Sequence, residues 1–153
     1  MTYRFLLFVS LISFGFTGPV QAAGSSSSST RSAKQPSAYD QGVQAVEAGN
    51  YERALELMEQ VVRSEPDNAD AWNYVGFSNR KLNRFEQALT AYQRALKIDP
   101  EHRGANEYLG ELYLQMGELD KASERLRVLD KACTFGCEEY DDLKKAIDRH
   151  QSG

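Results

Sequence analysis

One segment of the sequence, residues 69–102, limits the possible fold more than any other feature. Its first half places Trp72, Val75 and Gly76 on neighbouring positions of one helical face, because residues three and four apart lie side by side on a helix. Its second half carries apolar residues at helical spacing, and Pro100 ends it because proline cannot continue a helix. The segment therefore predicts two short helices joined by a turn. The apolar positions of the second helix are Phe85, Ala88, Leu89, Tyr92, Ala95 and Ile98.

The spacing of a tryptophan, a Val-Gly pair, an aromatic residue, two alanines and an Asp-Pro pair resembles the tetratricopeptide repeat (TPR), a 34-residue helix-turn-helix unit. The match covers about residues 35–136 and is strongest in 69–102. The resemblance implies an all-α solenoid, a right-handed superhelix of helix pairs whose first helices line a concave groove. It also implies binding of another protein or a peptide. The end of the chain resembles that of small exported bacterial TPR proteins.

The interior of the central unit is predicted from its small residues. A side chain at Gly76 would push the second helix away, and we expect the equally small Ala88 to face it, so that the two helix axes approach closely. Phe85 and Tyr92 are expected to fill the space on either side. These residues are interpreted as core, because a repeat buries its apolar face only against its neighbours.

A first, weaker repeat is predicted in residues 35–68. A shift of 34 positions places Gly42 on Gly76 and Pro66 on Pro100. Its first helix is poor in apolar residues, as is common in a terminal repeat with one face in water. Its second helix follows helical spacing well, with Tyr51, Ala54, Leu55, Met58, Val61 and Val62.

A third repeat is predicted in residues 103–136, where Gly110 corresponds to Gly76 and Asn106 stands in place of the tryptophan. Gly117 is expected to end its first helix in a left-handed conformation. This repeat lacks the closing proline, and we expect Gly136 to provide the reversal instead.

Residues 137–150 predict one more helix, which would cap the third repeat. Its apolar stripe consists of Tyr140, Leu143 and Ile147. Acidic residues crowd its first turns and basic residues its last, which suits the helix dipole. We expect the stripe to cover the open end of the third repeat and the charged face to keep the array soluble.

The N-terminal residues predict export. Arg4 gives residues 1–22 a positive start, residues 5–16 are largely apolar, and residues 20–22 read Val-Gln-Ala, which matches a cleavage site for a signal peptide. An uncleaved anchor is the alternative, but the run of about 12 residues is shorter than the ~20 that a membrane-spanning helix needs. We expect cleavage, no membrane association afterwards, and a periplasmic or secreted protein. The serine-rich residues 23–34 are expected to form a flexible leader.

Composition and motifs exclude several classes of function. The chain has a net charge of -4 and no basic run, so we expect no nucleic acid partner. It contains no nucleophile elbow, no phosphate-binding glycine loop and no paired-histidine zinc motif. Its acidic residues lie at helical spacing from lysines and arginines, as on a solvated helix face. We therefore expect no enzymatic activity, no cofactor and no metal.

The chain has two cysteines, Cys133 and Cys137. In an exported protein a disulfide between them is the favoured interpretation. It would fix the angle of the capping helix, although so small a loop adds little stability. A redox-active pair does not fit the C-x3-C spacing well, and a zinc site would lack two ligands. Free thiols or an intermolecular bond also remain open.

The resemblance implies a binding groove along the first helix of each repeat. Phe77 lies off the face of Trp72 and Val75, and Arg80 follows three residues later, a combination typical of binding hot spots. The alternative is that Phe77 packs against a neighbouring helix. Arg80 and Lys81 are expected near Glu107 and Glu111 of the third repeat, in a groove for an extended peptide or a partner helix. The candidate residues are Tyr39, Val43, Asn73, Tyr74, Phe77, Arg80, Lys81, Tyr108, Glu111 and Leu114.

Three interpretations of function follow. The first is an adaptor or assembly factor that binds a peptide or helix of another protein in the groove. The second is a structural protein that assembles with itself into a homo-oligomer. The third is a thiol-active maturation factor that uses Cys133 and Cys137.

Overall fold

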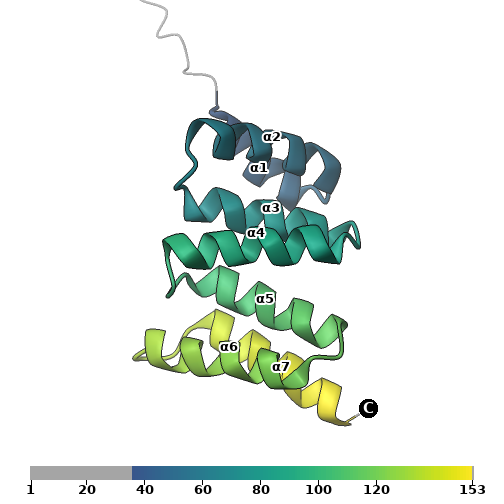
Figure 1. Ribbon diagram of the computed structural model, residues 1–153, viewed down its shortest axis with the longest axis vertical. Coiled ribbons are helices and arrows are strands. Elements are labelled where there is room, and N and C mark those ends of the chain that lie inside the picture. The colour runs from purple at the N-terminus through teal and green to yellow at the C-terminus, as the bar shows by residue number, and fades with distance from the viewer. Residues whose placement is uncertain (1–35, 153) are drawn as a thin grey trace, which may run out of the picture. The chain divides into compact units, whose positions relative to one another are not determined.

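The computed structural model describes residues 36–152 and contains, in that range, seven α-helices and no strand (Figure 1). The predicted all-α class, a solenoid of three helix pairs with a final capping helix, is confirmed. The predicted signal peptide (1–22) and leader (23–34) lie outside the described residues. The helices are α1 (Ala38–Glu47), α2 (Tyr51–Ser64), α3 (Ala69–Lys81), α4 (Phe85–Ile98), α5 (Arg103–Gln115), α6 (Leu119–Ala132) and α7 (Glu138–Ser152).

The turn inside each helix pair contains one residue with positive φ. These residues are Gly49 at 71°, Asn83 at 58° and Gly117 at 77°, spaced 34 positions apart. Glycine adopts this left-handed conformation freely, and asparagine is among the few other residues that tolerate it. The expected role of Gly117 is confirmed. Gly136, with φ of 84°, provides the predicted reversal before α7.

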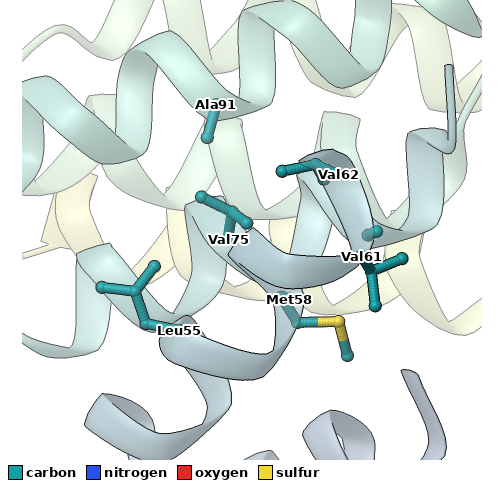
Figure 2. Close-up of a cluster of buried hydrophobic side chains, with 7 residues drawn as sticks. Leu55, Met58, Val61, Val62, Val75 and Ala91 are labelled. Carbon is teal, nitrogen blue, oxygen red and sulfur yellow. The ribbon is translucent and has the colours of Figure 1, made fainter. Parts of the chain in front are cut away.

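Neighbouring helix pairs share apolar clusters, of which the described residues contain three. Figure 2 shows one cluster in which α2 supplies most of the side chains and α3 and α4 complete it. A pair therefore cannot bury its apolar surface alone, which explains why the helices form only as an array. The cluster consists of Leu55, Met58, Val61, Val62, Ala71, Val75 and Ala91.

The glycines of the first helices form slots for large side chains. A Cβ atom added to Gly76 would lie 2.6 Å from ring carbons of Tyr92, and one added to Gly42 would lie 2.7 Å from Cε of Met58. The expectation that Ala88 faces Gly76 is therefore corrected, because the side chain seated against Gly76 is the fully buried Tyr92.

The third slot is filled differently. A Cβ atom added to Gly110 would lie 2.5 Å from Cδ2 of Leu143, which belongs to α7. Leu143 and Ile147 are buried with Ala122 and Leu129 of α6. Helix α7 thus packs against both α5 and α6 and covers the third pair, as the apolar stripe predicts.

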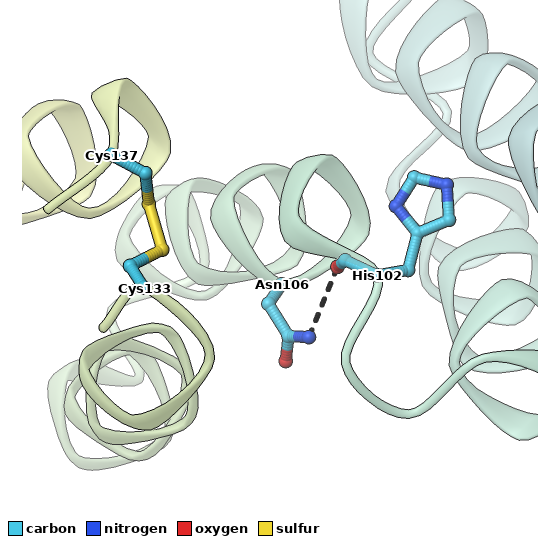
Figure 3. Close-up of a disulfide and its surroundings, with 4 residues drawn as sticks. All are labelled: His102, Asn106, Cys133 and Cys137. Carbon is cyan, nitrogen blue, oxygen red and sulfur yellow. Dashed lines mark hydrogen bonds between the residues drawn. A yellow bond between two sulfur atoms is a disulfide. The ribbon is translucent and has the colours of Figure 1, made fainter. Parts of the chain in front are cut away.

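The residue at the tryptophan position has the same hydrogen-bonding role in two repeats. Trp72 donates from Nε1 to the carbonyl oxygen of Pro66 at 2.9 Å. Asn106 donates from Nδ2 to the carbonyl oxygen of Pro100 at 3.1 Å, and also to that of His102 (Figure 3). Asparagine can replace tryptophan here because it supplies the same N–H donor.

A disulfide joins Cys133 and Cys137, with an S–S distance of 2.00 Å, between the end of α6 and the start of α7 (Figure 3). The pairing that the sequence favours is therefore present. The bond fixes the connection that brings α7 back onto α5 and α6.

We expect the double variant Cys133→Ser, Cys137→Ser to lose about 2 kcal/mol of unfolding free energy, because the bond closes a loop of only a few residues. The variant stays folded, since the apolar contacts of α7 remain. Thermal unfolding followed by circular dichroism measures this loss, and wild-type protein with reductant is the matched comparison. Identical unfolding temperatures for oxidised and reduced wild-type protein would contradict the expectation.

Within residues 36–152, none of the helices has the length and apolar character required to cross a membrane.

Candidate functional site

A row of aromatic rings runs across the first helices of the three pairs. The ring centroids of Tyr39 on α1 and Tyr74 on α3 lie 6.0 Å apart, and those of Phe77 on α3 and Tyr108 on α5 lie 4.9 Å apart. Tyr51, at the start of α2, lies 6.0 Å from Phe77. All five rings are half-buried, so each presents part of its surface to solvent. We call Tyr39, Tyr74, Phe77 and Tyr108 the aromatic row.

Burial raises the pKa of Tyr39 and of Tyr108 to about 12, with smaller contributions from nearby acidic groups. Both hydroxyl groups therefore stay protonated at neutral pH. They can donate hydrogen bonds to a carbonyl or carboxylate of a bound molecule.

Arg80 lies beside the aromatic row. Its guanidinium carbon is 5.5 Å from the ring centroid of Phe77 and 5.6 Å from that of Tyr108. Its Nη2 lies 2.7 Å from Oε2 of Glu111 on α5. The expected proximity of Arg80 to the acidic residues of the third repeat is confirmed. The ion pair links α3 to α5, and Lys81 adds a second cation, with Nζ 5.1 Å from the centroid of Phe77.

Two of the predicted groove residues are more deeply placed than their pattern indicates. Asn73 and Arg80 are treated in the sequence as polar positions outside the core, yet each is only 6% exposed. Both lie on α3, which α5 covers from one side. Oδ1 of Asn73 and Nε of Arg80 have no hydrogen-bond partner among the described residues.

The two aliphatic candidates belong to apolar clusters. Val43 packs in the same cluster as Tyr39 and Tyr74, so it supports the aromatic row. Leu114 packs in the cluster that α7 closes, so its side chain contributes to the cap of the third pair.

Glu107, which the sequence places in the groove near Arg80, is more deeply buried than its pattern indicates. It is 8% exposed on α5, and no hydrogen bond or ion pair within residues 36–152 involves its carboxylate. Its pKa is raised to about 8, chiefly by burial and also by Glu111 on the same helix and by Asp142 and Glu139 on α7, whereas Arg80 lowers it. A signal for this cluster lies only in the joint placement of α5 and α7, which sequence periodicity does not specify.

A cavity of about 290 Å³ lies at the start of α5, next to this cluster. At its edge, Nε2 of His102 is 3.0 Å from Oδ1 of Asp70, and Nδ1 of His102 accepts a hydrogen bond from the backbone of Ala105. His102 therefore caps α5 and is held by Asp70, which is a structural role. The cavity is lined by Asp70, Asp99, Glu101, His102, Arg103, Gly104 and Glu139.

Within the described range, no three His, Cys, Asp or Glu side chains are close enough together to hold a metal ion. The site combines aromatic rings, one nearly buried guanidinium and a group of carboxylates.

Stacked helix pairs with an aromatic surface on their first helices define the class of helical-repeat proteins, which present extended surfaces to other proteins. This chain belongs to the tetratricopeptide repeat family. Two family models, both described as tetratricopeptide repeat, match residues 39–76 and 80–147. The family fold is a scaffold for protein interaction, and the chain is a protein–protein interaction module of this kind.

Curated relatives share parts of their length with the chain. Tetratricopeptide repeat protein 37 of Xenopus laevis is 29% identical over 87 residues, which is 57% of this chain and 6% of that protein. PEX5-related protein of Homo sapiens is 25% identical over 92 residues, which is 60% of this chain and 15% of that protein. The chain therefore spans a small fraction of the length of these relatives.

Two solved structures show the same fold. PcrH, in complex with the chaperone binding region of PopD, has a TM-score of 0.65 at 19% identity and covers 75% of this chain and 86% of its own. The first TPR of Spaghetti (RPAP3), bound to an HSP90 peptide, has a TM-score of 0.66 at 16% identity and covers 76% of this chain and 91% of its own. At these identities the similarity concerns the fold.

Proposed function

We propose that the chain binds a segment of another protein along the aromatic row and acts as an adaptor or assembly factor in the periplasm, or outside the cell. The observation that carries the proposal is the row itself. Tyr39, Tyr74, Phe77 and Tyr108 come from three different helices, and all remain partly open to solvent. Aromatic rings provide large contact areas with few rotatable bonds, which makes them frequent hot spots at interfaces.

The comparisons support the same mode of binding. PcrH and the RPAP3 domain share this fold, and each of these structures contains a bound segment of another protein or a peptide. The length of the row, across three helix pairs, suits an extended peptide or one helix.

Two features support the export part of the proposal. Residues 1–22 carry the pattern of a signal peptide. The disulfide between Cys133 and Cys137 is of the kind that persists in oxidising compartments.

We expect Phe77→Ala to weaken binding of the partner at least about tenfold, because it removes the ring at the centre of the row. The variant stays folded and loses about 1 to 2 kcal/mol, less than a fully buried phenylalanine would, since Phe77 is half-buried. The partner is first captured by in-cell photocrosslinking from position 77 and identified by mass spectrometry. The affinity of this partner is then measured for the wild-type chain and for the Phe77→Ala variant.

Phe85→Ala is the matched control, because Phe85 is also half-buried but packs in the cluster of Tyr92 and Leu109. It is expected to lose similar stability and keep normal binding. An adduct to a second copy of the chain would favour self-assembly. The absence of any adduct would contradict binding along the aromatic row.

A further inference from the structure

We propose that the end of the groove formed by α5 and α7 recognises a basic side chain, a lysine or an arginine, in the bound protein segment. Glu107 and Glu139 are the receiving groups, with Glu111 beside them. The inference rests on the proposed function and specifies the partner of the same groove.

The first observation is the unpartnered carboxylate of Glu107. It is 8% exposed and takes part in no hydrogen bond or ion pair within the described part of the chain. The side chain is nearly buried, but its carboxylate oxygens are not among the fully buried atoms that lack a partner, so they keep contact with solvent. The remaining exposure leaves the carboxylate within reach of a side chain that enters from the groove.

The second observation is an unsatisfied acceptor on the same wall. Oδ1 of Asn73 on α3 is buried and has no hydrogen-bond partner among residues 36–152. Asn73 lies against the first turn of α5, because a Cβ atom added to Gly104 would be 3.2 Å from its Nδ2. Gly104 and Glu139 also line the acidic cavity at this end of the groove. A donor from an incoming group would satisfy this oxygen, whereas the unpartnered Nε of Arg80 belongs to a guanidinium that is already paired with Glu111 through Nη2.

The third observation is the balance of charge around Glu107. Arg80 on α3 is the cation that acts on it, and that guanidinium is already bonded to Glu111. Two carboxylates of α7, those of Asp142 and Glu139, lie close enough to Glu107 to raise its pKa. Of these, Asp142 is paired with Lys145 at 3.0 Å, whereas Glu139 has no ion pair among the described residues. Arg103 at the edge of the cavity does not balance this group of acids. One more cation next to Glu107 and Glu139 would balance their negative charge.

A basic side chain fits these surroundings better than a metal ion. No three potential metal ligands are grouped in the described range. The ring of Tyr108, next to Glu107 in the sequence and already 5.6 Å from one guanidinium, offers a face that attracts cations. Lysine and arginine carry several donors and no acceptor, which complements the carboxylates and Asn73.

The test uses a library of random 12-residue peptides displayed on phage, selected against the oxidised full chain. We expect the selected peptides to be enriched in lysine or arginine at one fixed position relative to their aromatic or apolar residues. In a selected peptide, replacement of that basic residue by glutamine should weaken binding about tenfold or more to the wild-type chain. For the double variant Glu107→Gln, Glu139→Gln, the same replacement in the peptide should change the affinity less than about twofold.

Glu138→Gln is the matched control. Glu138 is exposed on the same first turn of α7 and should leave the preference intact. Circular dichroism of each variant verifies that it is folded. Selected peptides that need Phe77 but lack a basic residue would overturn this inference and leave the proposed function standing. Failure to select any peptide above background would overturn both.

Discussion

Replacement of Gly76 by leucine is expected to unfold the second helix pair and to lower the unfolding free energy by about 3 kcal/mol or more. Even a Cβ atom at this position would lie 2.6 Å from Cδ1 and Cε1 of Tyr92. The ring cannot move aside, because it is fully buried between Ala88, Leu109 and Leu112. A leucine adds three more carbon atoms to the same space, so α3 and α4 must separate.

Urea denaturation followed by circular dichroism measures this effect. Gly104→Ala is the matched control, because Gly104 is also helical but a Cβ there would meet only the end of the Asn73 side chain, at 3.2 Å. We expect its unfolding free energy to stay within about 0.5 kcal/mol of wild type, since helix propensity offsets the small contact. If the Gly76→Leu variant were as stable as the control, α3 and α4 would have room for a larger side chain at position 76, and the expectation would be wrong.

Replacement of Arg80 by alanine is expected to lower the unfolding free energy by about 3 kcal/mol at pH 8.5. The change removes a nearly buried guanidinium from its ion pair with Glu111 and leaves the carboxylates of α5 and α7 facing one another. It also removes a side chain that packs over Phe77 and Tyr108.

The effect of this variant depends on pH through Glu107. The pKa of Glu107 is raised from 4.5 to about 8 in the folded chain, so its protonated form is favoured by folding. Its contribution to stability is complete below about pH 4.5 and is lost as the pH rises through about 8. Arg80 lowers this pKa, so its removal raises the folded-state pKa of Glu107 further, extends the decline in stability to higher pH and makes the total loss larger.

Urea denaturation at pH 5.5 and at pH 8.5 should therefore show a smaller loss for Arg80→Ala at the lower pH. Arg94→Ala is the matched control, because its ion pair with Asp67 spans 3.4 Å between well-exposed side chains. Such a pair contributes about 0.5 kcal/mol or less. Equal losses for the two variants, or a loss independent of pH, would contradict the role assigned to Arg80.

The fold is predictable because the sequence contains the same pattern of glycines and turn residues in three successive repeats. Glycine at 42, 76 and 110 and the turn residues at 49, 83 and 117 recur every 34 positions, and each marks a local requirement for space or for positive φ. Local requirements of this kind are visible in a single sequence. The disulfide was also favoured, since its two cysteines flank one short reversal.

The candidate site is harder to predict, because it depends on how one helix pair is set against the next. The burial of Asn73 and Arg80, and the contact of Gly110 with Leu143, follow from the placement of α5 and α7. Helical periodicity gives the face of each helix but not the angle between helices. The sequence places Glu107 in the groove near Arg80, together with Glu111, but it gives no sign that the Glu107 side chain is buried between α5 and α7.

The insertion of Leu143 beside Gly110 also decides which surface lies at this end of the described array. In a solenoid, the last pair leaves a surface on which a further pair could be added. Here α7 occupies that surface with its apolar side, and its exposed side carries Asp141, Lys144, Lys145 and Asp148. Helix α7 therefore leaves a charged surface, and not an apolar one, at this end of the described array. Docking of another copy onto this end would require α7 to be displaced first.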